Sequence, residues 1–334
     1  MSTQVSTPPT GIRPAPKGHT PARRGALPRV DVPSGAAARH ILWPYVIGVG
    51  TYHVVALLAF VPWLFSWTGV ALAFIGLYAF GTLGINLCFH RLLTHGSLVT
   101  PKWFEHCLSV LGVCCLQDTP ARWVAVHRMH HQYSDEQPDP HTPMVNFLWS
   151  HMGWLFVENS DVNSIAAYDR YARDILRDPF YMRMERNLNW LWINVASWAV
   201  FFGSGAAVGY LMGGTGMAAL QFGLSLLIWG VFVRTVAVWH ITWSVNSLSH
   251  VFGYQTYDTG EDSRNNWLVG LISNGEGWHN NHHADQRSAA HGHRWWELDV
   301  TYMTIKLFKA VGLANDVILP NSRTLDRAVI DAER

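Results

Sequence analysis

Charged side chains are scarce in this sequence. Only 14% of its 334 residues are Asp, Glu, Lys or Arg, whereas soluble domains carry about 25%. Hydrophobic residues make up 49% of the chain, so its folded surface cannot all face water and lipid must cover part of it. The formal net charge of +1 gives no reason to expect a nucleic-acid partner.

Cysteine pairs and two familiar metal motifs are also missing. The cysteines, Cys88, Cys107, Cys114 and Cys115, form no Cys-x-x-Cys pair, and we expect them to be reduced and buried. The His-Glu-x-x-His signature of zinc hydrolases is absent, and so are the Glu-x-x-His motifs of soluble di-iron bundles. The sequence therefore offers neither disulfides nor the ligand patterns of these two enzyme classes.

Long apolar runs, in contrast, occur four times. Residues 41–65, 68–89 and 188–212 each match the roughly 20 residues that a helix needs to cross about 30 Å of hydrocarbon. A fourth run, 217–240, continues past the bilayer length towards Gly253, so this helix should protrude. Short joints at Ser66 and at "GGTG" pair the runs. The sequence predicts an all-α integral membrane protein with four transmembrane helices in two hairpins.

The segments outside these runs give the expected sidedness. Residues 1–40 are rich in Pro, Gly, Ala and Arg and lack the apolar core of a secretory signal, so they are interpreted as a retained, disordered tail. Its basic charge predicts a cytoplasmic N-terminus. Four spans return the chain to that side, so the functional domain, 41–312, ends in a cytoplasmic tail, 313–334. The apolar run between Pro101 and Gln117 is interpreted as an interfacial helix, with a fifth span or a buried helix as alternatives.

Histidines cluster in a pattern that recurs. "HRMHH" and "GEGWHNNHH" both carry the spacing His-x-x-His-His, and residues three and four apart share a helix face. "HRLLTH" adds a pair five residues apart, or about 500° of helix, which shares a face only if the helix is distorted or ends between them. "NSLSH" places an Asn and a His four apart at the end of the fourth run. In order, these residues are His90, His95, His127, His130, His131, Asn246, His250, His279, His282 and His283.

The predicted topology brings all four clusters to the cytoplasmic ends of the spans, in a helical cap. Nine imidazoles exceed what one tetrahedral ion can hold, so two metals are the simpler interpretation. Imidazole suits Zn, Cu, Fe and Ni, but a His-rich, carboxylate-poor pair at a membrane surface favours two irons that activate dioxygen for attack on a lipid. Asp135, Asp139 and His141 could orient the ligating rings from outside, and Glu276 could serve as a base.

The remaining histidines are interpreted without a metal role. His53 and His240 lie within apolar helices and are expected to be hydrogen-bonded in the core or at a helix interface. The others, for which a surface or interfacial position is expected, are His19, His40, His106, His151, His291 and His293.

Together the motifs "HRLLTH", "HRMHHQYSDEQPDPH", "NSLSHVFG" and "GEGWHNNHH" resemble those of the membrane-bound delta-nine fatty acyl desaturases, in the bacterial form without a fused electron carrier. The resemblance covers about Gly81 to Trp296. It implies a non-haem di-iron centre that uses dioxygen and two electrons to place a cis double bond in a saturated acyl chain. It also implies that the nine clustered histidines are ligands and that Asn246 holds a metal through water. Gln117, Trp123 and Thr242 match the lining of a kinked acyl tunnel.

The resemblance leaves the partners open. The substrate is an acyl-CoA or a lipid-linked acyl chain, since "HRLLTHGSL" and "YARDILRDPF" are as close to one group of relatives as to the other. The stretch after His283 is too short for a haem carrier domain, so a ferredoxin, a rubredoxin or a small haem protein, with its reductase, is expected to supply electrons. The expected location is a bacterial inner membrane, with termini and active site cytoplasmic.

The alternative function is that of a related His-rich hydroxylase or alkane oxygenase. It shares iron and oxygen but inserts an oxygen atom, so its product differs. A metal transporter would instead hold its ligands near the middle of the bilayer on broken helices, rather than at the span ends.

Overall fold

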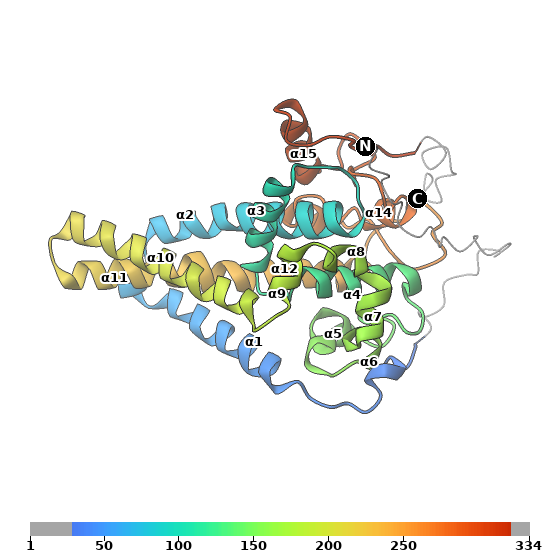
Figure 1. Cartoon of the computed structure of the whole chain (residues 1–334), viewed down its shortest axis with the longest axis horizontal. Coiled ribbons are helices and arrows are strands. Elements are labelled where there is room, and N and C mark those ends of the chain that lie inside the picture. Colours follow the sequence, from blue (N-terminus) through green and yellow to red (C-terminus); the bar gives the residue numbers. More distant parts are fainter. Residues whose placement is uncertain (1–28, 322–334) are drawn as a thin grey trace.

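The computed structural model describes residues 29–321, and every regular secondary-structure element in this range is a helix (Figure 1). The predicted tails, 1–40 and 313–334, lie mostly outside this range. Residues at their inner edges are joined to the body of the molecule. Val30 donates a backbone hydrogen bond to Met144, and Ile318 donates one to Ser97. The all-α class predicted from the sequence is confirmed.

Four helices are long and apolar enough to cross a membrane, as predicted: Trp43–Phe60, Trp67–Thr94, Asn189–Gly213 and Gly216–Leu248. The first comprises α1 (Trp43–Ala56) and η2 (Leu57–Phe60), and the second comprises α2 (Trp67–Gly76) and η4 (Leu77–Thr94). The third is α10 (Asn189–Gly213), and the fourth runs through α11 (Gly216–Leu227), η6 (Ile228–Val233) and α12 (Arg234–Leu248). The chain is an integral membrane protein.

Local chemistry explains where the hairpins turn. The first span ends before Pro62, whose preceding residue, Val61, is extended. Ser66 begins α2 as an N-cap whose hydroxyl accepts from the backbone N–H of Gly69 at 2.9 Å. At the second turn, Gly214 adopts φ +66°, a conformation that favours glycine, and Thr215 caps α11. Both turns lie at the same end of the molecule (Figure 1).

The second and fourth spans are longer than a bilayer requires. They contain 28 and 33 residues, about 42 Å and 50 Å of helix against roughly 30 Å of hydrocarbon. Their extra turns lie at the end opposite the hairpin turns (Figure 1). The length of the fourth helix agrees with its predicted protrusion, and the second span has a similar surplus. Arg234 of the fourth span contacts the second span, because its fully buried guanidinium lies 4.0 Å over the ring of Phe80. It also donates to the carbonyl of Cys114, which lies outside both spans.

Shorter helices form a cap around these projecting ends (Figure 1). α3 (Lys102–Val113) runs along η4, packed so closely that a Cβ on Gly84 would lie 2.3 Å from the backbone N of Gly112. α4 (Pro120–Tyr133) and α14 (His279–Ala284) carry the two histidine triplets. The other cap helices are α5 (Phe147–His151), α6 (Ser160–Asn163), α7 (Ile165–Tyr171), α8 (Arg173–Leu176), α9 (Pro179–Met184), α13 (Trp267–Ile272) and α15 (Val300–Ala310).

The cysteines are free, as expected. Cys88, Cys114 and Cys115 are buried, but Cys107 is exposed on α3. Its burial was wrongly predicted because the apolar run around it forms an amphipathic helix with one face outward.

Candidate metal centre

Four parts of the chain bring histidines to one place beyond the projecting span ends. η4 and the residue after it carry His90 and His95, while α4 carries the first triplet. The turn after α12 carries His250, and α14 carries the second triplet. All nine predicted histidines lie in two adjoining groups, which we call site A and site B.

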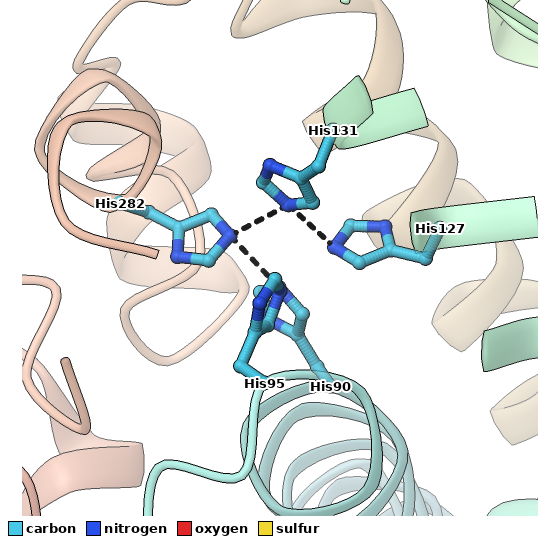
Figure 2. A group of neighbouring side chains, drawn as sticks. All are labelled: His90, His95, His127, His131 and His282. Carbon is cyan, nitrogen blue, oxygen red and sulfur yellow. Dashed lines mark hydrogen bonds between the residues drawn. The ribbon is translucent and has the colours of Figure 1, made fainter. Parts of the chain in front are cut away.

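Site A holds five imidazoles whose nitrogen atoms converge (Figure 2). Its members are His90, His95, His127, His131 and His282, and one ring nitrogen of each lies within 4.8 Å of the others. Nε2 of His282 is 3.1 Å from Nε2 of His90 and 3.0 Å from Nε2 of His131. Nε2 of His131 is in turn 3.0 Å from Nε2 of His127. Four of these rings therefore present the same nitrogen to one another.

Site B holds His130, His250, His279 and His283, all buried. Nε2 of His279 lies 3.0 Å from Nε2 of His250 and 3.1 Å from Nε2 of His283. Nε2 of His130 is buried and has no hydrogen-bond partner among the described residues. Site B thus repeats the convergence of site A with four rings instead of five.

Each triplet contributes to both sites, and its spacing explains how. On α4, His127 and His131 are four residues apart and belong to site A, while the ring between them, His130, belongs to site B. On α14 the arrangement is reversed, since His279 and His283 belong to site B and His282 belongs to site A. Residues four apart on a helix project about 40° apart, whereas neighbouring residues project about 100° apart. The ring three residues after the first therefore points away from the ring that follows it. Two such triplets facing each other generate two neighbouring sites.

His90 and His95 meet because the helix that carries them is distorted. η4 is wound with hydrogen bonds between residues five apart, and the N–H of His95 bonds to the carbonyl of His90 at 3.2 Å. Five residues then make about one turn, so the two rings lie on the same side of the helix and meet edge to face, with centroids 4.9 Å apart and planes at 75°. This resolves the alternatives that the sequence left open, and both residues join site A.

Hydrogen bonds among the imidazoles cannot satisfy all the converging nitrogens. Nδ1 of His90 pairs with Glu276 at 2.5 Å, so Nε2 of a neutral His90 carries a lone pair. A ring nitrogen has one proton or one lone pair, yet Nε2 of His282 faces two nitrogens. Metal–imidazole bonds of about 2.1 Å set at right angles would place ligand nitrogens about 3 Å apart, which matches these separations. The residues fit a metal ion in each site.

Burial keeps most of these rings neutral, as a metal ligand must be. It lowers the pKa of the imidazoles outside the spans well below the usual range, and neighbouring histidines lower the pKa further. This holds for His95, His127, His131, His279, His282 and His283. Burial also lowers the pKa of the adjacent His141, to about 3. His250 differs, because Asp135 outweighs the opposing effect of burial and raises its pKa to about 9.

Carboxylates fix the outer nitrogens of three rings. Oδ2 of Asp139 lies 3.0 Å from Nδ1 of His130, and Oδ2 of Asp135 lies 3.0 Å from Nδ1 of His250. Both acids were predicted from the sequence to orient imidazoles. Burial would raise the pKa of Asp139, but the charge and hydrogen bond of His130 lower it to about 2, so this carboxylate is ionised. Each contact holds the proton on Nδ1 and leaves Nε2 to face the site.

Glu276 provides the third carboxylate, and it does not lie in the position of a free base. It accepts from His90 through Oε2 and from both Nε and Nη2 of Arg91 through Oε1, at 3.2 and 2.7 Å. Arg91 is fully buried and also donates to Asp299 at 2.9 Å. Sequence spacing did not reveal this network, because its members lie far apart along the chain.

Two other histidine interpretations can be compared with the structure. His53 and His240 hydrogen-bond to each other at 3.0 Å between two spans, as expected. His291 was expected at the surface, but its ring is fully buried beside His282, with centroids 4.4 Å apart. It is missed because the two histidines of "AAHGH" lack the His-x-x-His-His spacing.

Asn246 lies on the last turn of α12, and His250 lies in the turn just after the helix ends at Leu248. The helix that was expected to carry both is therefore shorter than predicted. The backbone opens at this end, where the N–H of Ser249 bonds to the carbonyl of Ser244, five residues back. The Asn246 side chain makes no hydrogen bond to another described residue, and it lines the cavity next to the sites.

The three predicted tunnel residues line one cavity. Gln117 donates to Thr242 at 3.0 Å, and the indole N–H of Trp123 donates to Gln117 at 3.2 Å. The Trp123 ring stacks on His127 of site A, and His141 also lines the cavity. Thr242 also lines a second, smaller cavity. An apolar chain in the larger cavity would therefore pass directly beside site A.

Four apolar spans, two adjoining groups of buried imidazoles and a cavity beside them are the features of an integral membrane enzyme with a histidine-rich metal site. The sequence profile of the fatty acid desaturase family matches residues 62–305. The chain belongs to this family, and it is a fatty acid desaturase, an oxidoreductase.

The relatives of the chain are also desaturases, but they differ in the position of the double bond and in the molecule that carries the acyl chain. The chain is 42% identical over 295 residues to an sn-1 stearoyl-lipid 9-desaturase of Synechocystis sp., covering 88% of this chain and 85% of that protein. It is 41% identical to a chloroplastic palmitoyl-monogalactosyldiacylglycerol delta-7 desaturase of Arabidopsis thaliana, over 84% and 70% of the two chains. It is 37% identical to an acyl-CoA 5-desaturase of Anemone leveillei, over 90% and 89%.

Proposed function

We propose that the protein introduces a cis double bond between the ninth and tenth carbons of a saturated acyl chain carried by a membrane lipid. Two iron ions, dioxygen and two electrons would take part. The observation that carries the proposal is the cavity whose wall includes Trp123, His127 and Thr242, because it brings an extended apolar chain beside the converging nitrogens of site A. The relatives that act on lipids support the choice of carrier.

The proposed ligands are the nine histidines of sites A and B, with Asn246 acting through water. Iron at these positions would supply the reductive activation of dioxygen. The protein's own contribution is to hold the rings neutral and correctly turned. Asp139 keeps the proton of His130 on Nδ1, as Asp135 does for His250, so that Nε2 of each ring is free for the metal. His141, whose ring lies 4.4 Å from that of His130, supports the same ring.

The position of the double bond in the acyl chain would be selected by the distance from its anchored end and by the shape of the cavity. A saturated chain offers no polar handle, so the enzyme must anchor one end and bend the chain where the reacting carbons meet the metals. Thr242 lines both cavities, and the hydrogen bonds from Trp123 to Gln117 and from Gln117 to Thr242 fix the wall there. We place the bend at these three residues, which would set the double bond nine carbons from the carboxyl end.

The proposal also includes an electron donor and an orientation. A separate ferredoxin, rubredoxin or small haem protein, with its reductase, would deliver electrons to the cap from the cytoplasm. The basic residues near the first span support a cytoplasmic cap in a bacterial inner membrane.

Product analysis tests the proposal. The chain is expressed in a host that lacks desaturases, the lipids and the acyl-CoA pool are separated, and the fatty acids are derivatised for gas chromatography and mass spectrometry. We expect a cis-9 product that appears first in the lipid fraction. A hydroxylated product would favour the alternative hydroxylase. An unsaturated product that appears first in the acyl-CoA pool would favour acyl-CoA as the carrier. A double bond at a fixed distance from the methyl end would overturn the proposed anchoring.

Two substitutions test the proposed bend in the same assay. Trp123→Ala removes the ring that stacks on His127, and Thr242→Trp fills the junction of the two cavities. We expect both to lower turnover or to spread the product over neighbouring positions. Trp103→Ala serves as the control, because Trp103 is exposed on α3 away from the cavity. Unchanged product position and rate in both cavity variants would contradict the placement of the bend.

A further inference from the structure

A buried imidazole outside the nine proposed ligands lies against site A. His291 is fully buried, and neither of its ring nitrogens has a hydrogen-bond partner among the described residues. Its ring centroid is 4.4 Å from that of His282 and 5.3 Å from that of His90. A polar side chain sealed from water without a partner costs free energy, so its position needs an explanation.

The backbone holds His291 firmly in this position. Its N–H donates to Asp299 at 2.7 Å, and its carbonyl accepts from the side chain of Asn281 at 2.9 Å. Asn281 lies on α14 within the second triplet, while Asp299 also accepts from Arg91 next to His90. The loop is therefore tied to both elements that carry the adjacent site A residues. The ring is placed by the fold rather than by a chance rotamer of a free loop.

An acceptor and an unpaired ring nitrogen lie on either side of the His291 ring. Nδ1 of His291 lies 3.4 Å from Oε2 of Glu276, the oxygen that also pairs with His90. On the other side, Nδ1 of His282 is buried without a partner among the described residues. If Nε2 of His282 holds a metal, its proton must stay on Nδ1, where it needs an acceptor. Four other proposed ligands face a carboxylate through Nδ1: His90, His130 and His250 by hydrogen bonds, and His283 at 3.5 Å from Oε2 of Glu261.

We propose that His291 is a positioning residue of site A. It donates through Nδ1 to Glu276 and accepts through Nε2, directly or by way of one water, the Nδ1 proton of His282. In this way it fixes the orientation of two site A rings, those of His90 and His282, without itself binding the metal. Its nitrogens are not among the five that converge in site A. This inference rests on the proposed metal centre.

Two substitutions of similar size separate hydrogen bonding from packing. His291→Gln keeps a donor and an acceptor, whereas His291→Leu fills the space without either. The control is His293→Leu, which removes an imidazole from the same loop. The His293 ring bonds to Tyr257 and contacts neither site.

The experiment measures the rate at which a ferrous chelator removes iron from the purified, iron-loaded full-length chain in detergent. We expect His291→Leu to release iron from one site about tenfold or more faster than wild type, and His291→Gln to stay within about threefold. His293→Leu should match wild type. Thermal unfolding of the iron-free variants reports any loss of the fold.

The outcomes distinguish the inference from the proposal beneath it. A wild-type chain that retains no iron would overturn the metal centre itself and the role of His291 with it. A wild-type chain that holds iron, with His291→Leu releasing it at the wild-type rate, would overturn only the role of His291. Equal acceleration in the Leu and Gln variants would also overturn it, because packing or loop geometry would then explain the effect.

Discussion

At the scale of single residues, the fixed proton on each imidazole decides what the sites can do. A ring that carries its proton on Nδ1 presents a lone pair at Nε2, and the carboxylates of Asp135, Asp139 and Glu276 enforce this for three rings. Burial does the rest by lowering the pKa of the surrounding histidines. The sequence predicts the histidines and the orienting role of two of these acids. Glu276 is predicted only as a possible base, and its contact with His90 appears only in the fold.

The contact between Asp139 and His130 gives a direct prediction. Asp139→Asn removes the charge that stabilises the His130 proton, and the amide can turn its N–H towards the ring. We expect iron affinity to fall by about 10- to 100-fold, as is usual when such a partner is removed. Equilibrium competition with a chelator measures this. Asp169→Asn is the control, because Asp169 is exposed on α7 and pairs with Arg173. Equal affinities in the two variants would contradict the role of Asp139.

At the scale of elements, close helix packing supports the membrane domain. α10 and α11 approach so closely that a Cβ on Gly209 would lie 2.4 Å from the carbonyl oxygen of Ala218, while a Cβ on Gly203, on the same helix, would meet open space. Small residues allow this kind of packing in lipid, where van der Waals contact drives association. The hairpin thus depends on particular glycines rather than on hydrophobicity alone.

A matched pair of substitutions tests this dependence. Gly209→Val forces the two helices apart and should lower stability by about 1–3 kcal/mol, the usual cost of overpacking. Gly203→Val should change stability by less than about 0.5 kcal/mol, since nothing opposes its side chain. Thermal unfolding in detergent compares them. Equal melting temperatures for the two variants would show that the hairpin tolerates separation.

The sequence predicts elements well where one physical rule acts alone. Bilayer length and lack of charge locate the start of each of the four spans to within two residues, although the ends differ by up to eight. The His-x-x-His-His spacing identifies two helices whose histidines converge. Sequence-based prediction fails where several segments act together. The π-helical form of η4, which brings His90 next to His95, depends on how that helix packs, and no residue pattern predicts it. His291 and the network of Arg91, Glu276 and Asp299 are missed for the same reason.

At the scale of the whole molecule, two short hairpin turns at one end leave the histidines and both ends of the described chain at the other (Figure 1). This arrangement gathers distant parts of the sequence at one membrane face. In the proposed reaction, a cap built in this way would receive electrons from a soluble donor protein, while the substrate chain would enter from the adjacent lipid.

Cysteine labelling tests the proposed orientation. In a Cys107→Ser background, which removes the exposed native cysteine, Ser34→Cys and Leu319→Cys should react only from the cytoplasm. Met212→Cys lies next to the second hairpin turn and is exposed, so it should react only from the opposite side. The reagent is a membrane-impermeant maleimide applied to intact cells and to inverted vesicles. Labelling of positions 34 and 319 from opposite sides would rule out four spans.

If each histidine triplet serves two metal sites at once, removing one histidine from either site must change the number of irons that the chain holds. Iron per chain is measured for the purified wild type and for His282→Ala and His130→Ala, which remove one triplet member from site A and site B respectively. We expect about two irons in the wild type and about one in each variant, with desaturation lost in both and membrane insertion retained. A wild type that binds a single metal, or that desaturates fully when loaded with zinc alone, would contradict this expectation.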